Sequence, residues 1–488
     1  MMWTTSSKKD EIPNYPPQSA VPTFPALTRA EEPEGWCRRN HKNKPQSNSS
    51  GAAALIFTSG GMFLGDPGPR AYFTNKHLPM SWFIGAIVGV ILGAIICNRI
   101  PKKLITCFAS LLVTVSGILL VADPRSLNAL LAARYINGCA LGLVFPLTFV
   151  LVGEQCVKSL RGMNAAAVGS MCLQLGVFLQ IIYSYIWPQD ASFDGAQMMG
   201  ILSIFWGFLS FFMAFFLQLE SPIFYLARGQ EEMAIDILRR LQRPFTVTHE
   251  TYEQLMEHKH YLAESREKTL LQSAIIGFPA LLKLSFYRVF SAASSCFYTY
   301  FAFSYAVSIA FKYDATWAYN VYGFLAWIGT MIVTFTIDSK GRKTPMIFGF
   351  FCCSCLCFSL AGVLNDEFSV RDSGTMTVVM FLMMAYQLFA GISTASSSVY
   401  LTEAFPLAVK PYYVAITFIA EMSIHILVIA VHSEPWSYNV YDLPPYFYTL
   451  GGLSVVFFVV AIAALPETKK NTLRECLAKF RKLVNCQY

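Results

Sequence analysis

Long apolar runs alternate with short polar segments along most of the chain, and this pattern is typical of a membrane protein. A helix needs about 20 apolar residues to cross about 30 Å of hydrocarbon. The first half carries six such runs, at residues 52–66, 80–98, 104–122, 127–153, 163–186 and 199–219. The second half carries six more, at residues 289–311, 316–337, 345–364, 375–401, 412–432 and 446–465. We therefore expect twelve transmembrane helices in two groups of six.

The polar segments divide the chain into five parts. Residues 1–50 are rich in Pro, Ser and Asn, so we expect a disordered cytoplasmic tail there. Two six-helix bundles are expected over 51–219 and 289–465. Between them, 220–288 reads as a cytoplasmic loop with short helices, and 466–488 as a cytoplasmic C-terminal tail.

Within the loop, the sequence EEMAIDILRRL places Met233, Ile237, Leu238 and Leu241 at helical spacing. Such a stripe predicts an amphipathic helix that packs on the inner face of the bundles.

The distribution of basic residues predicts how the chain is oriented in the membrane. Lys and Arg are concentrated in the segments that share one side when both termini are placed inside, as the positive-inside rule requires. Only 14% of the residues are charged and 55% are apolar, so the net charge of +7 reflects the inner leaflet rather than nucleic-acid binding. The first ten residues lack an apolar run, so no cleavable signal peptide is expected. We expect a multi-pass protein in a lipid bilayer, with both termini in the cytoplasm.

Common motifs of nucleotide-binding sites and enzyme active sites are missing from the sequence. It shows no P-loop, GxSxG, HExxH or paired CxxC, so neither an enzyme nor a bound cofactor is expected. The 13 cysteines fall in apolar runs or on the expected cytoplasmic side, which argues against a disulfide framework. The dense run FCCSCLC has no His or carboxylate partner, so no metal site is expected.

Two pairs of charged motifs recur at equivalent places in the two halves. NRIPKK at 98–103 corresponds to DSKGRK at 338–343, and GEQCVKSLRG corresponds to TEAFPLAVK. The second pair places an acid and a base seven residues apart in each half. These motifs are either simple positive-inside anchors or ion pairs that form in one conformation and break in another. The repeat favours the ion pairs.

The chain resembles the sugar-porter family of the major facilitator superfamily. NRIPKK is similar to that family's (D/N)RxGRR loop, with Pro101 in place of Gly, and DSKGRK is a fuller match. LESPIFYLARGQ at 219–230 is similar to PESPRWLxxxGR, and PETKKNTLRE at 466–475 to PETKGxTLEE.

The resemblance implies an all-α membrane fold of twelve helices in two bundles, a central solute site, alternating access and a monomeric transport unit. It further implies a location in the plasma membrane. It also implies a conformational latch on the cytoplasmic side. The expected latch residues are Arg99, Lys102, Lys103, Arg134, Glu154, Arg161, Glu220, Asp338, Gly341, Arg342, Lys343, Glu403, Lys410 and Glu467.

The residues expected to bind solute depart from the family pattern. The fifth-helix Gln of the family is Gly169 here, with Gln174 nearby. The seventh-helix glutamines fall near Ser294 and Ser295, and the Asn near Tyr300. The tenth-helix Trp becomes Ser398. These losses argue against an ordinary glucose carrier, because polyhydroxyl recognition needs convergent amides and aromatic stacking.

Ionisable residues enter the expected membrane core instead. Glu421 lies near the middle of the eleventh span and His425 follows one turn later, on the same face. An ionisable group at that depth indicates function unless it has a partner, so both are candidates for solute binding and proton coupling. The alternative is that the two side chains merely satisfy each other. Asp66, at the outer end of the first span, is a weaker proton-coupling candidate.

The leading hypothesis is a secondary transporter of a small polar solute, most plausibly a sugar or sugar-like metabolite, by facilitated diffusion or proton symport. One alternative is an organic cation or zwitterion transporter, in which Glu421 supplies the counter-charge. The other is a solute sensor of the same fold that does not transport. Nothing in the sequence points to nucleic acid as a partner.

Overall fold

The described structure is entirely helical. It is a computed structural model and describes residues 35–65, 77–186, 193–311, 315–366, 368–431 and 440–482. Eleven helices in these ranges are long and apolar enough to cross a membrane. The predicted all-α fold is therefore confirmed, and the twelfth predicted span, which is the first along the chain, is considered separately below.

The first half begins with α2 and ends with α8. Its helices are α2 (Lys44–Gly65), α3 (His77–Ile96), α4 (Lys102–Ala122), α5 (Leu127–Gln155), the continuous run of α6 (Arg161–Ala166), η2 (Ala167–Cys172) and α7 (Leu173–Ile186), and α8 (Gly195–Phe216). Within this half, α3 packs along α5 and α4 packs along α8.

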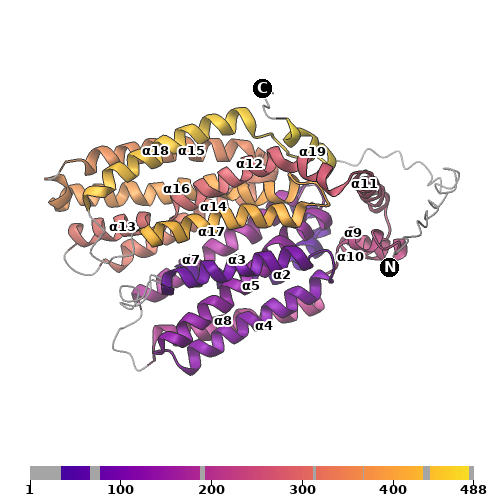
Figure 1. Cartoon of the computed structure of the whole chain (residues 1–488), viewed down its shortest axis with the longest axis horizontal. Helices are drawn as coiled ribbons and strands as arrows, with labels where there is room; N and C mark the ends of the chain where they lie inside the picture. Colours follow the sequence, from indigo (N-terminus) through magenta and orange to yellow (C-terminus); the bar gives the residue numbers. More distant parts are fainter. Residues whose placement is uncertain are drawn as a thin grey trace, which may run out of the picture.

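The second half begins with a helix pair. Its helices are α12 (Leu270–Ser294), α13 (Phe297–Ala310), α14 (Thr316–Lys340), α15 (Lys343–Leu364), α16 (Ser373–Glu403), α17 (Lys410–Val431) and α18 (Leu443–Ala464), with two short turns, η3 (Ser369–Arg371) and η4 (Val440–Asp442). The two halves form two bundles side by side (Figure 1), which touch where α3 meets α17 and where α7 meets α14.

Short helices gather at one end of the bundles. They are α1 (Trp36–Lys42), α9 (Pro222–Leu226), α10 (Glu231–Arg240), α11 (His249–Arg266) and α19 (Leu473–Arg481). Figure 1 shows α9, α10, α11 and α19 at the same end. The positive-inside pattern assigns this end to the cytoplasm, and we call it the inner end. In the predicted apolar stripe of α10, Ile237, Leu238 and Leu241 are buried whereas Met233 is exposed.

The first membrane helix starts earlier than predicted. The disordered tail was expected to reach residue 50, but residues 36–42 form α1 and residues 44–50 form the first two turns of α2. Gln46, Ser49 and Ser50 are buried against other helices. Hydrogen bonds explain why these polar residues are tolerated: Gln46 Oε1 accepts from the Val157 amide at 3.1 Å. The polar start lowers the mean hydropathy of α2, which therefore does not number among the eleven apolar helices.

The seventh span also starts earlier than predicted. The cytoplasmic loop was expected to continue to residue 288, but α12 begins at Leu270 and places Arg288 inside the bundle. The helix breaks after Ser294, and α13 restarts at Phe297. The carbonyl oxygens of Ala293 and Ser294 exposed by the break accept hydrogen bonds from Tyr446 at 2.9 Å and Tyr386 at 3.2 Å. These hydroxyls satisfy carbonyl groups at the end of α12 that have no partner within the helix.

Candidate solute-binding site

A cavity of about 250 Å3 lies between the two halves. Helices α2, α3, α5 and α7 line it on one side, and α12, α13, α14, α16 and α17 on the other. Its lining reaches Leu64 and Pro79, at the outer ends of α2 and α3, and extends inward as far as Phe145 and Ser397. Both halves thus contribute to the cavity, as alternating access requires.

Most of the predicted solute-binding residues face this cavity. The lining includes Gln174, Ser294, Ser295, Tyr300, Glu421 and His425. Ser398 lies behind the wall, where its hydroxyl is 2.7 Å from that of the lining residue Ser170. Asp66 lies outside the described residues.

Arg288 is the charged lining residue that the sequence reading missed. Its Nη1 donates to Ser397 Oγ at 3.1 Å and its Nη2 donates to the carboxylate of Glu421. The guanidinium carbon also lies 5.4 Å from the ring centre of Phe145. Arg288 looked like a basic flank of a span starting at residue 289, although the apolar run from Leu270 onward could have placed it within the helix.

Glu421 and His425 do not pair with each other in the described structure. Glu421 bonds Arg288 instead, while the His425 ring stacks on Phe83, with centroids 4.9 Å apart and planes at 15°. A guanidinium offers a full charge and a forked donor, so it attracts the carboxylate more strongly than an imidazole does. The alternative of a self-satisfied Glu421–His425 pair is therefore wrong.

Arg134 lines the same cavity rather than the inner end. The sequence reading grouped it with the latch because it precedes Glu154 by 20 residues in a familiar motif. On the continuous helix α5, 20 residues span about 30 Å, so the two side chains lie at opposite levels of the bundle. Arg134 is 3% exposed, and it lies on the side of the cavity formed by the first half, whereas Arg288 lies on the side formed by the second half.

Gly169 explains one departure from the family pattern. A Cβ at this position would lie 2.6 Å from Ser398 Oγ and 2.7 Å from the ring of Phe149, both closer than van der Waals contact allows. The cavity wall therefore has no room for a glutamine here. The amide of Gln387, which donates to the hydroxyl of Tyr322, provides an alternative polar group from α16.

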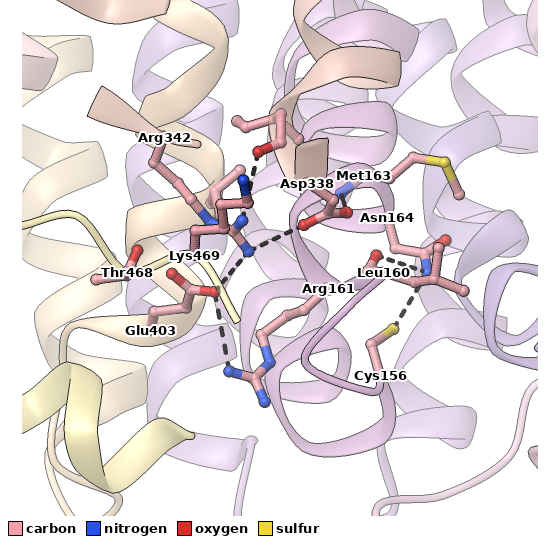
Figure 2. Close-up of polar contacts among 12 residues, drawn as sticks. Cys156, Leu160, Arg161, Met163, Asn164, Asp338, Arg342, Glu403, Thr468 and Lys469 are labelled. Atoms are coloured by element: carbon pink, nitrogen blue, oxygen red, sulfur yellow. Dashed lines mark hydrogen bonds and ion pairs between the residues drawn. The ribbon is translucent and has the colours of Figure 1, made fainter. Parts of the chain in front are cut away.

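Four residues close the inner end by connecting the two halves, and we call Arg161, Asp338, Arg342 and Glu403 the latch. Arg161 Nη1 lies 3.8 Å from Glu403 Oε1, and the Met163 amide donates to Asp338 Oδ2 at 2.8 Å. Arg342 joins both carboxylates, at 3.3 Å from Glu403 and 3.0 Å from Asp338. Figure 2 shows these side chains converging from the two bundles. Burial lowers the pKa of Arg342, but the nearby carboxylates outweigh this and raise it.

A second charged group ties the first half together. Lys102 Nζ lies 3.4 Å from Glu220 and 4.0 Å from Glu154, and the Lys103 amide donates to Glu220 at 3.4 Å. Ser221 donates its hydroxyl to Glu154. Arg99 takes part through its backbone carbonyl, which accepts from Arg228 at 3.3 Å.

In the second half, the Glu467 carboxylate accepts hydrogen bonds from the two backbone amides that follow Gly341. Arg342 N lies 2.9 Å and Lys343 N lies 3.0 Å from its Oε2. Lys410 is fully buried and packs across the interface, where its Nζ would lie 2.5 Å from a Cβ added to Gly153. Apart from Arg134, the predicted latch residues thus gather at the inner end.

Comparison with known proteins assigns the chain to a family of membrane transporters, in agreement with the helical fold. The family model described as "Sugar (and other) transporter" matches residues 73–480. The chain belongs to this family. It is 24% identical over 431 residues to the probable metabolite transport protein CsbC of Bacillus subtilis, covering 86% of this chain and 89% of that one. The arabinose-proton symporter of the same organism is 23% identical, covering 85% and 88%.

Solved structures support the fold of this sugar transporter family member. The proton:xylose symporter XylE bound to 6-bromo-6-deoxy-D-glucose superposes with a TM-score of 0.72 at 20% identity, covering 89% of this chain and all of that one. The inward-open conformation of the xylose transporter XylE from E. coli reaches only 0.59, with 89% of this chain and 98% of that one covered.

Proposed function

We propose that this protein moves a small polar solute across the membrane through the central cavity by alternating access. The observation that carries the proposal is a cavity that both halves share, that contains polar side chains such as Gln174 and Gln387, and that lies outward of a closed latch. Solute enters from the outer end, and breakage of the ion pairs between the halves opens the inner end. Glu154, Glu220, Lys102 and the neighbouring charges keep the first half rigid during this motion.

A sugar or sugar-like metabolite is the solute class we propose. The cavity volume of about 250 Å3 lies just below the range of drug-sized sites, which suits a small metabolite. Gln174, Gln387 and the serine hydroxyls supply donors and acceptors for hydroxyl groups, and Trp82 and Phe83 supply flat apolar faces.

Proton coupling is the second part of the proposal. Glu421 lies on α17, eleven residues from Lys410 at the start of this 22-residue helix, so the carboxylate is at mid-depth. It faces the cavity beside Arg288 and one turn from His425. A carboxylate whose counter-charge is a single guanidinium can exchange a proton when a solute disturbs that pair.

The organic-cation alternative receives less support from the same site. Glu421 already bonds Arg288, so a cationic solute must displace a guanidinium to reach it. The sensor alternative predicts solute binding without turnover.

Uptake separates these alternatives. The full-length protein, expressed in cells deficient in sugar transport, is tested with radiolabelled hexoses, pentoses, polyols and an organic cation at external pH 5.5 and 7.5. We expect uptake of a neutral or acidic polyhydroxyl solute. Uptake of the cation alone would contradict the proposal, and binding without uptake at normal surface expression would support the sensor.

A further inference from the structure

We propose that the solute joins a hydroxylated ring to a short apolar group, and that the first half of the cavity binds the apolar group. The ring lies at mid-depth, and the apolar group lies toward the outer end. The natural substrate is then a small glycoside rather than a free sugar. This inference rests on the proposed function, because it concerns the occupant of the same cavity.

The two sides of the cavity differ in chemistry. On the side of the second half, the described lining side chains that are not buried are all polar: Ser295, Tyr300, Thr394 and Glu421. On the side of the first half, most of those that are not buried are apolar: Leu64, Pro79, Leu173 and Val177. We call these four residues the apolar wall.

Helical spacing shows that the apolar wall belongs to whole helix faces. Leu173 and Val177 are one turn apart on α7, and Ile181 follows on the same face and also lines the cavity. On α3, Pro79 is followed at the same spacing by Phe83, which lines the cavity as well. Such a stripe normally faces a protein core. Where it lines a cavity instead, it indicates a ligand with apolar surface of its own.

The polar and apolar parts of the first-half side lie at different depths. The run of α6, η2 and α7 leads outward from the latch, so Val177 lies farther out than the cavity-lining Gln174. Leu64 and Pro79 lie at the outer ends of α2 and α3. Glu421 faces the cavity from the second half at mid-depth. Polar side chains from both halves thus surround the middle of the cavity, and the first-half side becomes apolar toward its outer end.

A free sugar fits only part of this arrangement. Its hydroxyl groups lose water against the apolar wall, whose side chains offer no hydrogen bond in return. An aromatic or alkyl substituent gains from the same contact, because its apolar surface leaves water. Arg134 also lines the cavity near the outer end of α5, but it is 3% exposed and offers a solute little surface. The cavity volume of about 250 Å3 keeps the substituent small.

Free sugars and their phenyl β-glycosides test the inference in pairs. Glucose, galactose and xylose are each compared with the phenyl glycoside of the same ring, so the result does not depend on which pattern of hydroxyl groups the cavity prefers. Binding to the purified full-length protein is measured by calorimetry. For the ring that binds best, we expect the glycoside to bind roughly tenfold or more tightly than the free sugar, because part of the phenyl surface leaves water.

Equal or weaker binding of the glycoside would overturn the inference. That result is expected if the apolar wall serves only to pack against the second half when the outer end closes.

Two variants of nearly unchanged shape locate the apolar group. Val177→Thr places a hydroxyl on the apolar wall, and we expect the preference for the glycoside to fall roughly threefold, since a buried methyl group is lost. Thr394→Val is the matched control on the opposite side, where we expect both ligands to weaken and their ratio to stay the same. A ratio that survives in Val177→Thr, or that falls equally in the two variants, would contradict the assignment to the apolar wall.

Uptake into proteoliposomes separates this inference from the proposed function. Faster uptake of the radiolabelled glycoside than of its free sugar, measured against protein-free liposomes, would support the inference. Uptake of the free sugar alone, with the glycoside acting only as a blocker, would reject the glycoside as substrate and leave the transporter proposal standing. Neither binding nor uptake of any pair, by protein with a normal melting temperature, would count against both.

Discussion

Gly341 shows how one backbone conformation supports the inner end. Its φ of 101° lies in a region that residues with a side chain rarely adopt, and a Cβ would lie 2.5 Å from Glu467 Oε2. The turn after α14 therefore reverses direction at this residue and presents the amides of Arg342 and Lys343 to the Glu467 carboxylate.

We predict that Gly341→Ala lowers the free energy of unfolding by about 1–3 kcal/mol, through backbone strain and the displaced carboxylate. The measurement is the thermal melting of the purified protein in detergent. Gly452→Ala is the matched control, since nothing lies within 4 Å of a Cβ at Gly452. Equal melting temperatures for the two variants would show that the conformation of Gly341 is not limiting.

Arg288 and Gly169 are two single residues whose roles become clear only from their contacts in the fold. Read along the sequence, Arg288 is a basic residue next to an apolar run and Gly169 is the loss of a family glutamine. Inside the bundle, Arg288 is the partner of Glu421, and Gly169 makes room for Phe149 and Ser398.

Among the helices, α11 docks the cytoplasmic loop between the halves onto the chain that follows the latch residue Glu403. Tyr261 of this helix is buried and donates to the Phe405 carbonyl at 3.2 Å. His258, one turn earlier, is half-buried. Burial, and then the positive charge of Arg161, lower the pKa of His258 from 6.5 to about 4. Its neutral form is therefore the form that fits the docked helix.

We predict that docking of α11 weakens as pH falls. Because the docked imidazole binds its proton less readily than the free one, the stabilisation is complete above about pH 6.5 and is lost as pH falls from 6.5 toward 4. The expected loss is about 1 kcal/mol, since the side chain is only half-buried. Amide hydrogen exchange in α11 at pH 7 and pH 5, corrected for the intrinsic rate, measures it.

The control for this prediction lies two residues along the same helix, where His260 is exposed. We expect His258→Gln to remove the pH dependence of α11 exchange and His260→Gln to retain it. An unchanged pH dependence in His258→Gln would assign the effect to another group.

For the whole molecule, the proposed alternating-access cycle couples the cavity to the latch at the inner end. Each latch carboxylate contacts both halves: Glu403 meets Arg161 and Arg342, and Asp338 accepts from Met163 while bonding Arg342. Separating the halves at the inner end would break these contacts together, so in the proposed cycle they favour the state in which this end is closed.

We predict that Glu403→Gln shifts the population toward the inward-facing state by tenfold or more, since removing one member of a buried charge cluster costs about 3–5 kcal/mol in the closed form. The measurement is labelling of Ser295→Cys by a membrane-impermeant maleimide added outside, compared with the protein lacking that cysteine. Ser295 lines the cavity and is exposed. Labelling should be fast in the otherwise native protein and slow in the variant.

Glu264→Gln provides the control, because Glu264 forms ion pairs with Lys268 and Arg474 at the surface of the same end. Exposed pairs contribute only about 0–1 kcal/mol, so outside labelling should not change. Equal labelling of the Glu403 and Glu264 variants would mean that the latch does not control which side is open.

The sequence alone determined the membrane class, the helical fold, the family and most of the inner charged residues. Hydrophobic run length depends on local composition, and the latch motifs lie in short loops whose position follows from the helices they join. Lys102 and Arg342, for example, could be placed at the inner end without knowing any contact. The boundaries of the first and seventh spans were less accurate, because hydrogen bonds and helix packing allow polar residues such as Gln46 and Arg288 inside the bundle.

Only the tertiary structure decided the chemistry of the cavity. Arg288 and Glu421 are 133 residues apart in the chain and meet because α12 packs on α17. Their contact, the stacking of His425 on Phe83 and the cavity position of Arg134 depend on how helices rotate against one another. Charge and hydropathy along a sequence depend only on local composition, so they do not show how one helix is rotated against another. The contact between the Arg288 guanidinium and the Glu421 carboxylate depends on that rotation and is visible only in the folded structure.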